Sequence, residues 1–245
     1  MIAAMTVTSV MSVPQAMAAI ALDRTRVIFN GTEKSVSLNI ENQHLNLPYL
    51  AQAWIEDEKG NKINGPLIVV PPVQRIEAGA KSQLKIQTLP TVAQLPQDRE
   101  SVFYFNVREI PPRSEKTNVL QIALQTRIKL FYRPKAVVAS RTDLENPWQK
   151  KLTLTRQGNQ YVVNNPTPYY ITISEATNKV NGTSIAGFQP LMLAPKGSQT
   201  LGGDAGSLGN KPVLTYVNDY GGRPQLTFNC NGNTCAAAEI VDEGN

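Results

Sequence analysis

The side chains that most often catalyse reactions are sparse in this chain. His44 is its only histidine and lies in a polar stretch, and no serine or cysteine occurs in a recognisable nucleophile elbow. Nucleophilic hydrolysis would need a base beside such a nucleophile. Glycine motifs for phosphates or dinucleotides are absent, and the scattered carboxylates suggest no acid–base pair. These residue types favour a binding or structural protein over an enzyme, and no cofactor is expected.

The two cysteines suggest a disulfide. Cys230 and Cys235 bracket Asn231-Gly232, a dipeptide that strongly favours a hairpin turn. A metal site would need further ligands, and His44 is far away in the sequence. We therefore expect a disulfide across a short β-turn in an oxidising compartment. Because the closed loop is small, its stabilising effect should lie below the usual range of about 2–4 kcal/mol.

The first eighteen residues resemble an export signal. Ile2 to Met17 are mostly small or apolar, and Ala16-Met17-Ala18 fits the small-x-small cleavage pattern. The apolar run is short for a transmembrane helix and no stop-transfer pattern follows. It lacks a preceding lysine or arginine, unlike most signals. We predict a leader over residues 1–18 and an exported protein that begins near Ala19.

One cationic stretch, Asn118–Pro134, alternates like a β-strand. Leu120, Ile122 and Leu124 form an aliphatic row on one side, and the cations Lys129 and Arg133 follow. Since successive strand residues point to opposite faces, we predict a long strand over Val119–Tyr132. Strict alternation places Lys129 on the face opposite the row. A bulge or a strong twist between Leu124 and Lys129 would bring the lysine to the same face as the row; otherwise the lysine lies on the other face.

The remaining pattern indicates an all-β protein. Strand-like runs separated by turn residues recur along the chain, and no long stretch has helical periodicity. Roughly the first 115 mature residues contain seven such runs, including one over Ile20–Phe29 and one over Pro66–Val70 that Pro71-Pro72 marks as an edge or sheet-switching strand. A polar run near residues 139–147 precedes a second series. We predict two immunoglobulin-like β-sandwich domains, over residues 19–138 and 139–245.

The net charge of +5 does not indicate a nucleic-acid partner. Lys150-Lys151 is the only adjacent pair of cations, whereas nucleic-acid binders carry a basic stripe. An acidic or carboxylate-bearing partner remains compatible with this charge.

Several long motifs carry a family resemblance. Asp98–Pro112 (DRESVFYFNVREIPP), together with the row-bearing stretch, resembles the signature of the periplasmic chaperones of the chaperone–usher pilus pathway. Ala21–Phe29, Pro48–Trp54, Pro71–Arg75 and Asn218–Pro224 match the same family in the same order. The resemblance covers the mature chain and is strongest to the P-pilus type. The link Pro111–Asn118 between the last two strands, without an extra cysteine pair, resembles the short-loop subfamily.

The resemblance implies a fold and a function without chemistry. Such chaperones have two immunoglobulin-like domains in an L or boomerang shape. They lend their seventh strand to pilus subunits that lack a last strand, and the outer-membrane usher then receives the subunit. The implied location is the periplasm. Self-association that covers the exposed row is a further expectation.

The resemblance also assigns roles to single residues. Arg26 and Lys129 match two cations that anchor the subunit's terminal carboxylate, although the residues alone give no preference for Arg26 over Arg24. Leu120, Ile122 and Leu124 match the donated aliphatic row. Three further residues match an interdomain ion network that holds the angle between the domains: Glu100, Arg133 and Asp219.

Two other functions fit the sequence less well. A pilus subunit or adhesin should be a single truncated sandwich with an alternating N-terminal extension, whereas this chain predicts a complete seventh strand and a second domain. A secreted hydrolase lacks the residues for its chemistry.

Overall fold

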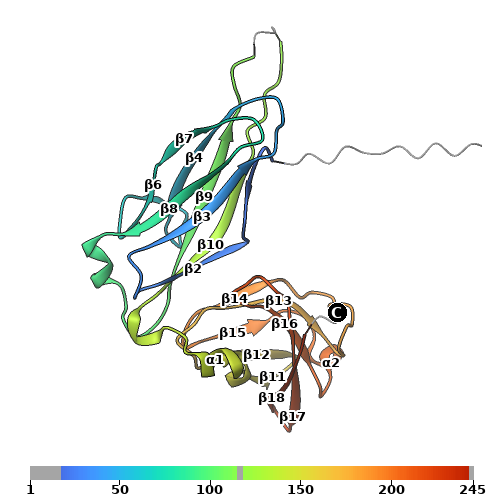
Figure 1. Ribbon diagram of the computed structural model, residues 1–245. Coiled ribbons are helices and arrows are strands. Elements are labelled where there is room, and N and C mark those ends of the chain that lie inside the picture. Colours follow the sequence, from blue (N-terminus) through green and yellow to red (C-terminus); the bar gives the residue numbers. More distant parts are fainter. Residues whose placement is uncertain (1–17, 115–117, 243–245) are drawn as a thin grey trace, which may run out of the picture.

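The computed structural model describes residues 18–114 and 118–242, which form two β-rich units. Figure 1 shows the two units meeting at an angle. Each unit has its own cluster of buried hydrophobic side chains. The predicted leader lies outside the described residues except for Ala18. Among the described residues, no helix is long and apolar enough to span a membrane.

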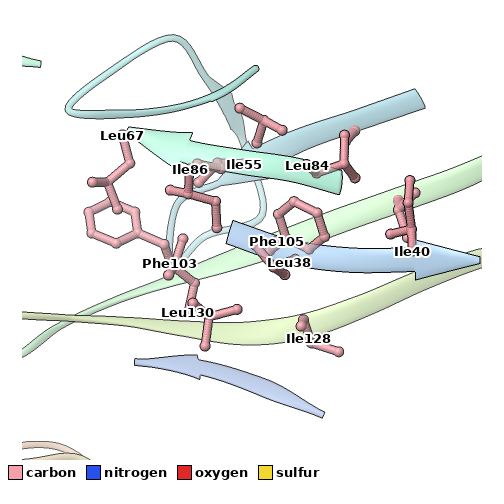
Figure 2. Close-up of a cluster of buried hydrophobic side chains, with 14 of the residues drawn as sticks. Leu38, Ile40, Ile55, Leu67, Leu84, Ile86, Phe103, Phe105, Ile128 and Leu130 are labelled. Atoms are coloured by element: carbon pink, nitrogen blue, oxygen red, sulfur yellow. The ribbon is translucent and has the colours of Figure 1, made fainter. Parts of the chain in front are cut away.

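The first unit is a sandwich of two sheets. Leu38 and Leu84 of one sheet pack against Phe105 and Leu130 of the other, and Figure 2 shows this interior. One sheet has the order β1 (Ile20–Leu22), β3 (Ser35–Asn42), β8 (Lys81–Thr88) and β6 (Leu67–Val70). The other has the order β2 (Arg26–Asn30), β10 (Gln125–Arg133), β9 (Ser101–Ile110), β4 (Tyr49–Glu56) and β5 (Lys62–Ile63), with β7 (Val73–Ile76) also on β4. The short helix η1 (Pro90–Gln94) lies between β8 and β9.

Two chain segments cross from one sheet to the other. The single strand predicted over Ile20–Phe29 is wrong, because it divides into β1 and β2, which belong to different sheets. Asp23 holds this crossing, since its carboxylate accepts the backbone and side-chain N–H groups of Asn39. At Pro71-Pro72 the chain leaves β6, an edge strand, and enters β7 of the other sheet, as predicted.

The strand predicted over Val119–Tyr132 is too long at its start. β10 begins at Gln125, and the connection from β9 therefore spans residues 111–124 rather than the eight residues Pro111–Asn118. β9 ends at Ile110 before two prolines, so the described residues 118–123 have no strand beside them. Alternation predicts a strand only where a partner can take its backbone hydrogen bonds.

The second unit is one hydrogen-bonded path of eight strands around a core that includes Leu154, Ile173 and Phe228. Its order is β14 (Leu191–Leu193), β13 (Ile171–Thr177), β16 (Val213–Val217), β17 (Gln225–Asn231), β18 (Thr234–Val241), β11 (Thr153–Gln157), β12 (Gln160–Asn165) and β15 (Gly197–Leu201). The short helices are η2 (Lys135–Val137), α1 (Arg141–Glu145), η3 (Trp148–Lys151) and α2 (Ala205–Leu208). The boundary predicted at residues 138/139 falls between η2 and α1 and stays a prediction.

The predicted disulfide is confirmed in the β17–β18 hairpin. Cys230 and Cys235 are register partners, and their sulfurs are bonded. The turn is one residue later than predicted, because Asn231 pairs with Thr234 and Gly232 takes a positive φ of 60°. Glycine adopts this left-handed conformation without the penalty of a Cβ.

Candidate functional site

Two cations from neighbouring strands meet where the units face each other. β2 and β10 are parallel, and Lys129 is the register partner of Arg26. Both side chains lie on the face away from the core. The Arg26 Nη1 donates to the Val217 carbonyl at 3.1 Å, and the Lys129 Nζ donates to the Thr172 hydroxyl at 2.9 Å. The two cations of the first unit therefore reach the surface of the second.

This cation pair has no carboxylate partner of its own in the described chain. Neither Arg26 nor Lys129 takes part in an ion pair there, and the buried Nε of Arg26 has no hydrogen-bond acceptor. Burial and the neighbouring Arg26 lower the pKa of Lys129 to about 8. Burial also lowers the pKa of Arg26, against the pull of the Asp219 and Glu100 carboxylates. An anionic ligand would offset the repulsion between these two like charges, and the Arg26 Nε is free to donate a hydrogen bond to it.

A cavity of about 410 Å³ opens beside Arg26. Its walls come from both units, with Ile28 and Arg133 on one side and Tyr220 on the other. Arg26 lines this cavity, whereas Lys129 does not, so the cavity gives access from solvent to the Arg26 side of the pair.

The aliphatic row lies just ahead of β10 and outside the core. Leu120 is 84% exposed and Ile122 is 65% exposed, whereas Leu124 is half-buried. β2 pairs only with residues 129–133 of β10, while β9 pairs with residues 125–132. Along residues 125–128, the edge of β10 on the β2 side thus has no ladder partner in the described part of the chain, and residues 118–123 pair with no strand on either side.

The face of Lys129 follows from an unbroken register. The β9–β10 pairing has no shift, and the Glu109 N–H donating to the Leu124 carbonyl extends it by one residue. Ile128 and Leu130 point into the core. The row residues have the same parity as Ile128 and Leu130, so the side chain of Lys129 lies on the opposite face, and β10 contains no bulge.

The structure brings Glu100, Arg133 and Asp219 together. The Arg133 Nη2 lies 2.7 Å from Glu100 Oε1, and its Nη1 lies 3.0 Å from Asp219 Oδ2. The second Glu100 oxygen accepts the Tyr170 N–H at 2.8 Å. Burial raises the pKa of Glu100 to about 7, against the opposing effect of Arg133. These bonds join β10 to two segments of the second unit.

Two aromatic rings complete the setting of this arginine. The Arg133 guanidinium carbon lies 5.2 Å from the Trp148 ring centre and 4.8 Å from that of Tyr169. Cation–π contacts of this kind add to the ion pairs. No local sequence pattern marks either ring, or the contacts at Thr172 and Val217, because each depends on how the units meet.

No group of histidine, cysteine or acidic side chains that could hold a metal occurs within the described ranges. Two β-rich units with a cation pair between them and an exposed apolar row favour a binding site for another chain over a catalytic site.

The comparisons with known proteins identify the family. Residues 19–138 match the model for the pili and flagellar-assembly chaperone, PapD N-terminal domain, and residues 147–228 match the pili assembly chaperone PapD, C-terminal domain. The chain belongs to this family of pilus-assembly chaperones, which are not enzymes, and it has their two immunoglobulin-like domains.

Curated relatives and solved structures agree. The chain is 56% identical over 224 residues to the probable fimbrial chaperone YfcS of Escherichia coli K12, covering 91% of this chain and 88% of that protein. It is 53% identical over 220 residues to the chaperone protein PapD of Escherichia coli, covering 89% and 90%. The periplasmic chaperone SfaE matches with a TM-score of 0.65 at 32% identity, covering 91% and 98%. A structure of the Salmonella enterica SafA pilin in complex with the SafB chaperone matches with a TM-score of 0.71 at 26% identity, covering 89% and 99%.

Proposed function

We propose that this chain is a periplasmic chaperone that captures pilus subunits by lending them residues 118–128 as a strand. The observation that carries the proposal is the half-buried cation pair Arg26–Lys129, which has no carboxylate partner among the described residues and lies at the end of an open edge of β10. Related proteins support the partner class, since the SafB chaperone was solved with a pilin.

The open edge and the row provide two complementary kinds of contact. Strand addition, of which chaperone–pilin pairs are a standard example, uses main-chain hydrogen bonds for affinity and alternate side chains for specificity. Leu120 and Ile122 are exposed and would fill pockets of the subunit. Complete burial of one such side chain contributes about 1.5–3 kcal/mol.

The cation pair sets the direction of the captured strand. β10 runs from the row towards Lys129, so a subunit strand whose carboxylate ends at Arg26 and Lys129 runs parallel to β10. Bonds from cations to a carboxylate are each worth about 1.5–3 kcal/mol. A terminal carboxylate would thus fix the register of the subunit strand against the row.

Two further steps belong to the proposal. The captured subunit is passed to the outer-membrane usher, which exchanges the lent segment for another strand. In the absence of a subunit, the exposed row is an aggregation liability, and a second copy of the chain covers it in a self-capping dimer.

Co-expression with an exported pilin tests capture. The expected result is a one-to-one complex isolated from the periplasm, with the subunit identified by mass. The alternative role of a pilus subunit predicts that the chain instead enters fibres. Recovery of the chain from fibres, or its failure to bind any pilin, would contradict the proposal.

A further inference from the structure

A buried carboxylate stands at the base of the aliphatic row. Glu109 lies on the core-facing side of β9, in line with Phe105 and Val107, and its side chain is buried. No lysine or arginine of the described chain forms an ion pair with it. A buried charge without a cation is costly unless hydrogen bonds satisfy it.

The two oxygens of Glu109 bond to different sheets. Oε2 accepts the Ile20 N–H of β1 at 3.1 Å, and Oε1 accepts the Leu124 N–H at 3.3 Å. β1 belongs to one sheet, and Leu124 leads directly into β10 of the other. The carboxylate therefore closes the end of the sandwich from which the row emerges.

The same residue ends the β9–β10 ladder. The Glu109 N–H donates to the Leu124 carbonyl at 3.0 Å, which continues the antiparallel register. The Leu124 N–H, however, donates to the side chain of Glu109. Leu124 is the last row residue held to the sandwich, because Leu120 and Ile122 are largely exposed.

We propose that Glu109 is a positioning residue that fixes the register between the aliphatic row and the Arg26–Lys129 pair, and that it ties this register to β1. The inference rests on the proposed capture of subunits. From Leu124 to Lys129 the chain advances about 17 Å at the usual strand rise of about 3.3 Å per residue. The hydrogen bonds of the Glu109 carboxylate with the Leu124 and Ile20 amides, called the clasp below, hold that spacing. A captured strand therefore contacts the row and the cations at the same time.

Amide hydrogen exchange in the unaltered chain tests the clasp. The Leu124 and Ile20 amides should exchange at least tenfold more slowly than the amide of exposed Gln121. Equal rates at Leu124 and Gln121 would overturn the proposal without any variant.

Substitutions test the clasp further. Glu109→Gln keeps one acceptor oxygen and Glu109→Ala keeps none. Hydrogen exchange at the Leu124 and Ile20 amides should therefore be faster in Glu109→Gln than in the unaltered chain, and fastest in Glu109→Ala. Glu33→Gln, at an exposed turn, is the matched control and should change nothing. If Glu109→Ala fails to fold, Glu109→Gln decides the comparison.

Binding of two synthetic peptides tests positioning. Each has three valines in a threonine background and a free terminal carboxylate, and in one peptide the valines lie two residues further from that carboxylate. The unaltered chain should prefer one register about tenfold, and Glu109→Gln should reduce this preference to about twofold. Its preference for free carboxylate over amide should persist, since the cations are intact.

The outcomes separate the two proposals. An unchanged register preference in Glu109→Gln, with capture intact, would overturn the role of Glu109 alone. Failure of the unaltered chain to bind either peptide would overturn capture itself, and the role of Glu109 in capture with it.

Discussion

Arg26 and Lys129 are direct register partners across the parallel β2–β10 pair, so two cations lie side by side on the face that meets the second unit. Each also bonds to that unit, through Val217 and Thr172. Like charges repel, and within the described residues no acid is ion-paired to either cation. This arrangement supports the proposal that the pair binds a carboxylate of another molecule.

Removal of either cation should weaken capture strongly while leaving the chaperone folded. Lys129→Ala and Arg26→Ala each lose about 1.5–3 kcal/mol of charge-assisted bonding, a drop of about 10- to 150-fold in affinity. Yield of the co-expressed pilin complex is the measurement. Arg24→Ala is the control, because Arg24 is paired with Asp23 at the surface. Full pilin recovery with both Lys129→Ala and Arg26→Ala would rule out the anchor.

Capture should weaken above pH 8. The pKa of Lys129 in the free protein is lowered to about 8, and a bound carboxylate raises it again. Binding then requires proton uptake above pH 8, and affinity falls by up to about tenfold per pH unit. Calorimetry with a peptide that ends in a free carboxylate, from pH 7 to 9.5, measures this slope. Lys129→Arg should flatten the profile; an unchanged slope in that variant would assign the pH effect to another group.

The same shift has the opposite effect on folding. The pKa of Lys129 lies below its ordinary value of 10.5, so the unfolded chain binds more protons between pH 8 and 10.5. The contribution of this residue to stability should therefore rise with pH across that window. Urea unfolding at several pH values measures the free energy of unfolding of the unaltered chain and of Lys129→Gln. The difference between the two should rise from pH 8 to 10.5, and a fall would contradict the prediction.

A charge in the row should weaken capture without touching the anchor. Ile122→Glu places a carboxylate where the subunit groove is expected to be apolar, so we expect at least a tenfold loss of affinity. Ala123→Glu is the matched control, because Ala123 is exposed and has the opposite parity. Equal effects of the two substitutions would mean that the row has no specific face.

Loss of Arg133 should destabilise the protein strongly. Glu100 is almost fully buried against this guanidinium, and Arg133→Ala leaves its charge unpaired. Breaking a buried pair in this way costs about 3–5 kcal/mol. Arg141→Ala, which removes an exposed ion pair with Glu145, should change the free energy of unfolding by less than about 0.5 kcal/mol. Urea denaturation compares the two variants, and equal losses of unfolding free energy would show that the buried network contributes no more to stability than an exposed ion pair.

Local patterns predicted the fold class well, because alternation and turn residues are local signals. The disulfide followed from two cysteines around a turn. Local patterns give little signal for the strands β15 and β18, because their residues are polar or alanine-rich, as in Ser198-Gln199-Thr200 and Ala236–Ala238, and carry little apolar alternation. The start of β10 was misplaced because its partner ends at Ile110.

The site depended on information that local patterns lack. The adjacency of Arg26 and Lys129 arises from pairing between strands about a hundred residues apart, and only family resemblance favoured Arg26 over Arg24. The contacts of Arg133 with Glu100 and Asp219 likewise join three distant segments. Glu109 escaped notice because nothing in its sequence context marks a carboxylate that accepts two backbone N–H groups.

The decisive measurement is a structure of this chain bound to a pilus subunit. We expect a subunit strand along residues 118–128, parallel to β10, with its terminal carboxylate within hydrogen-bond distance of Arg26 and Lys129. Leu120 and Ile122 should be buried in the subunit. A subunit bound elsewhere, or one whose terminal carboxylate lies away from both cations, would contradict this expectation.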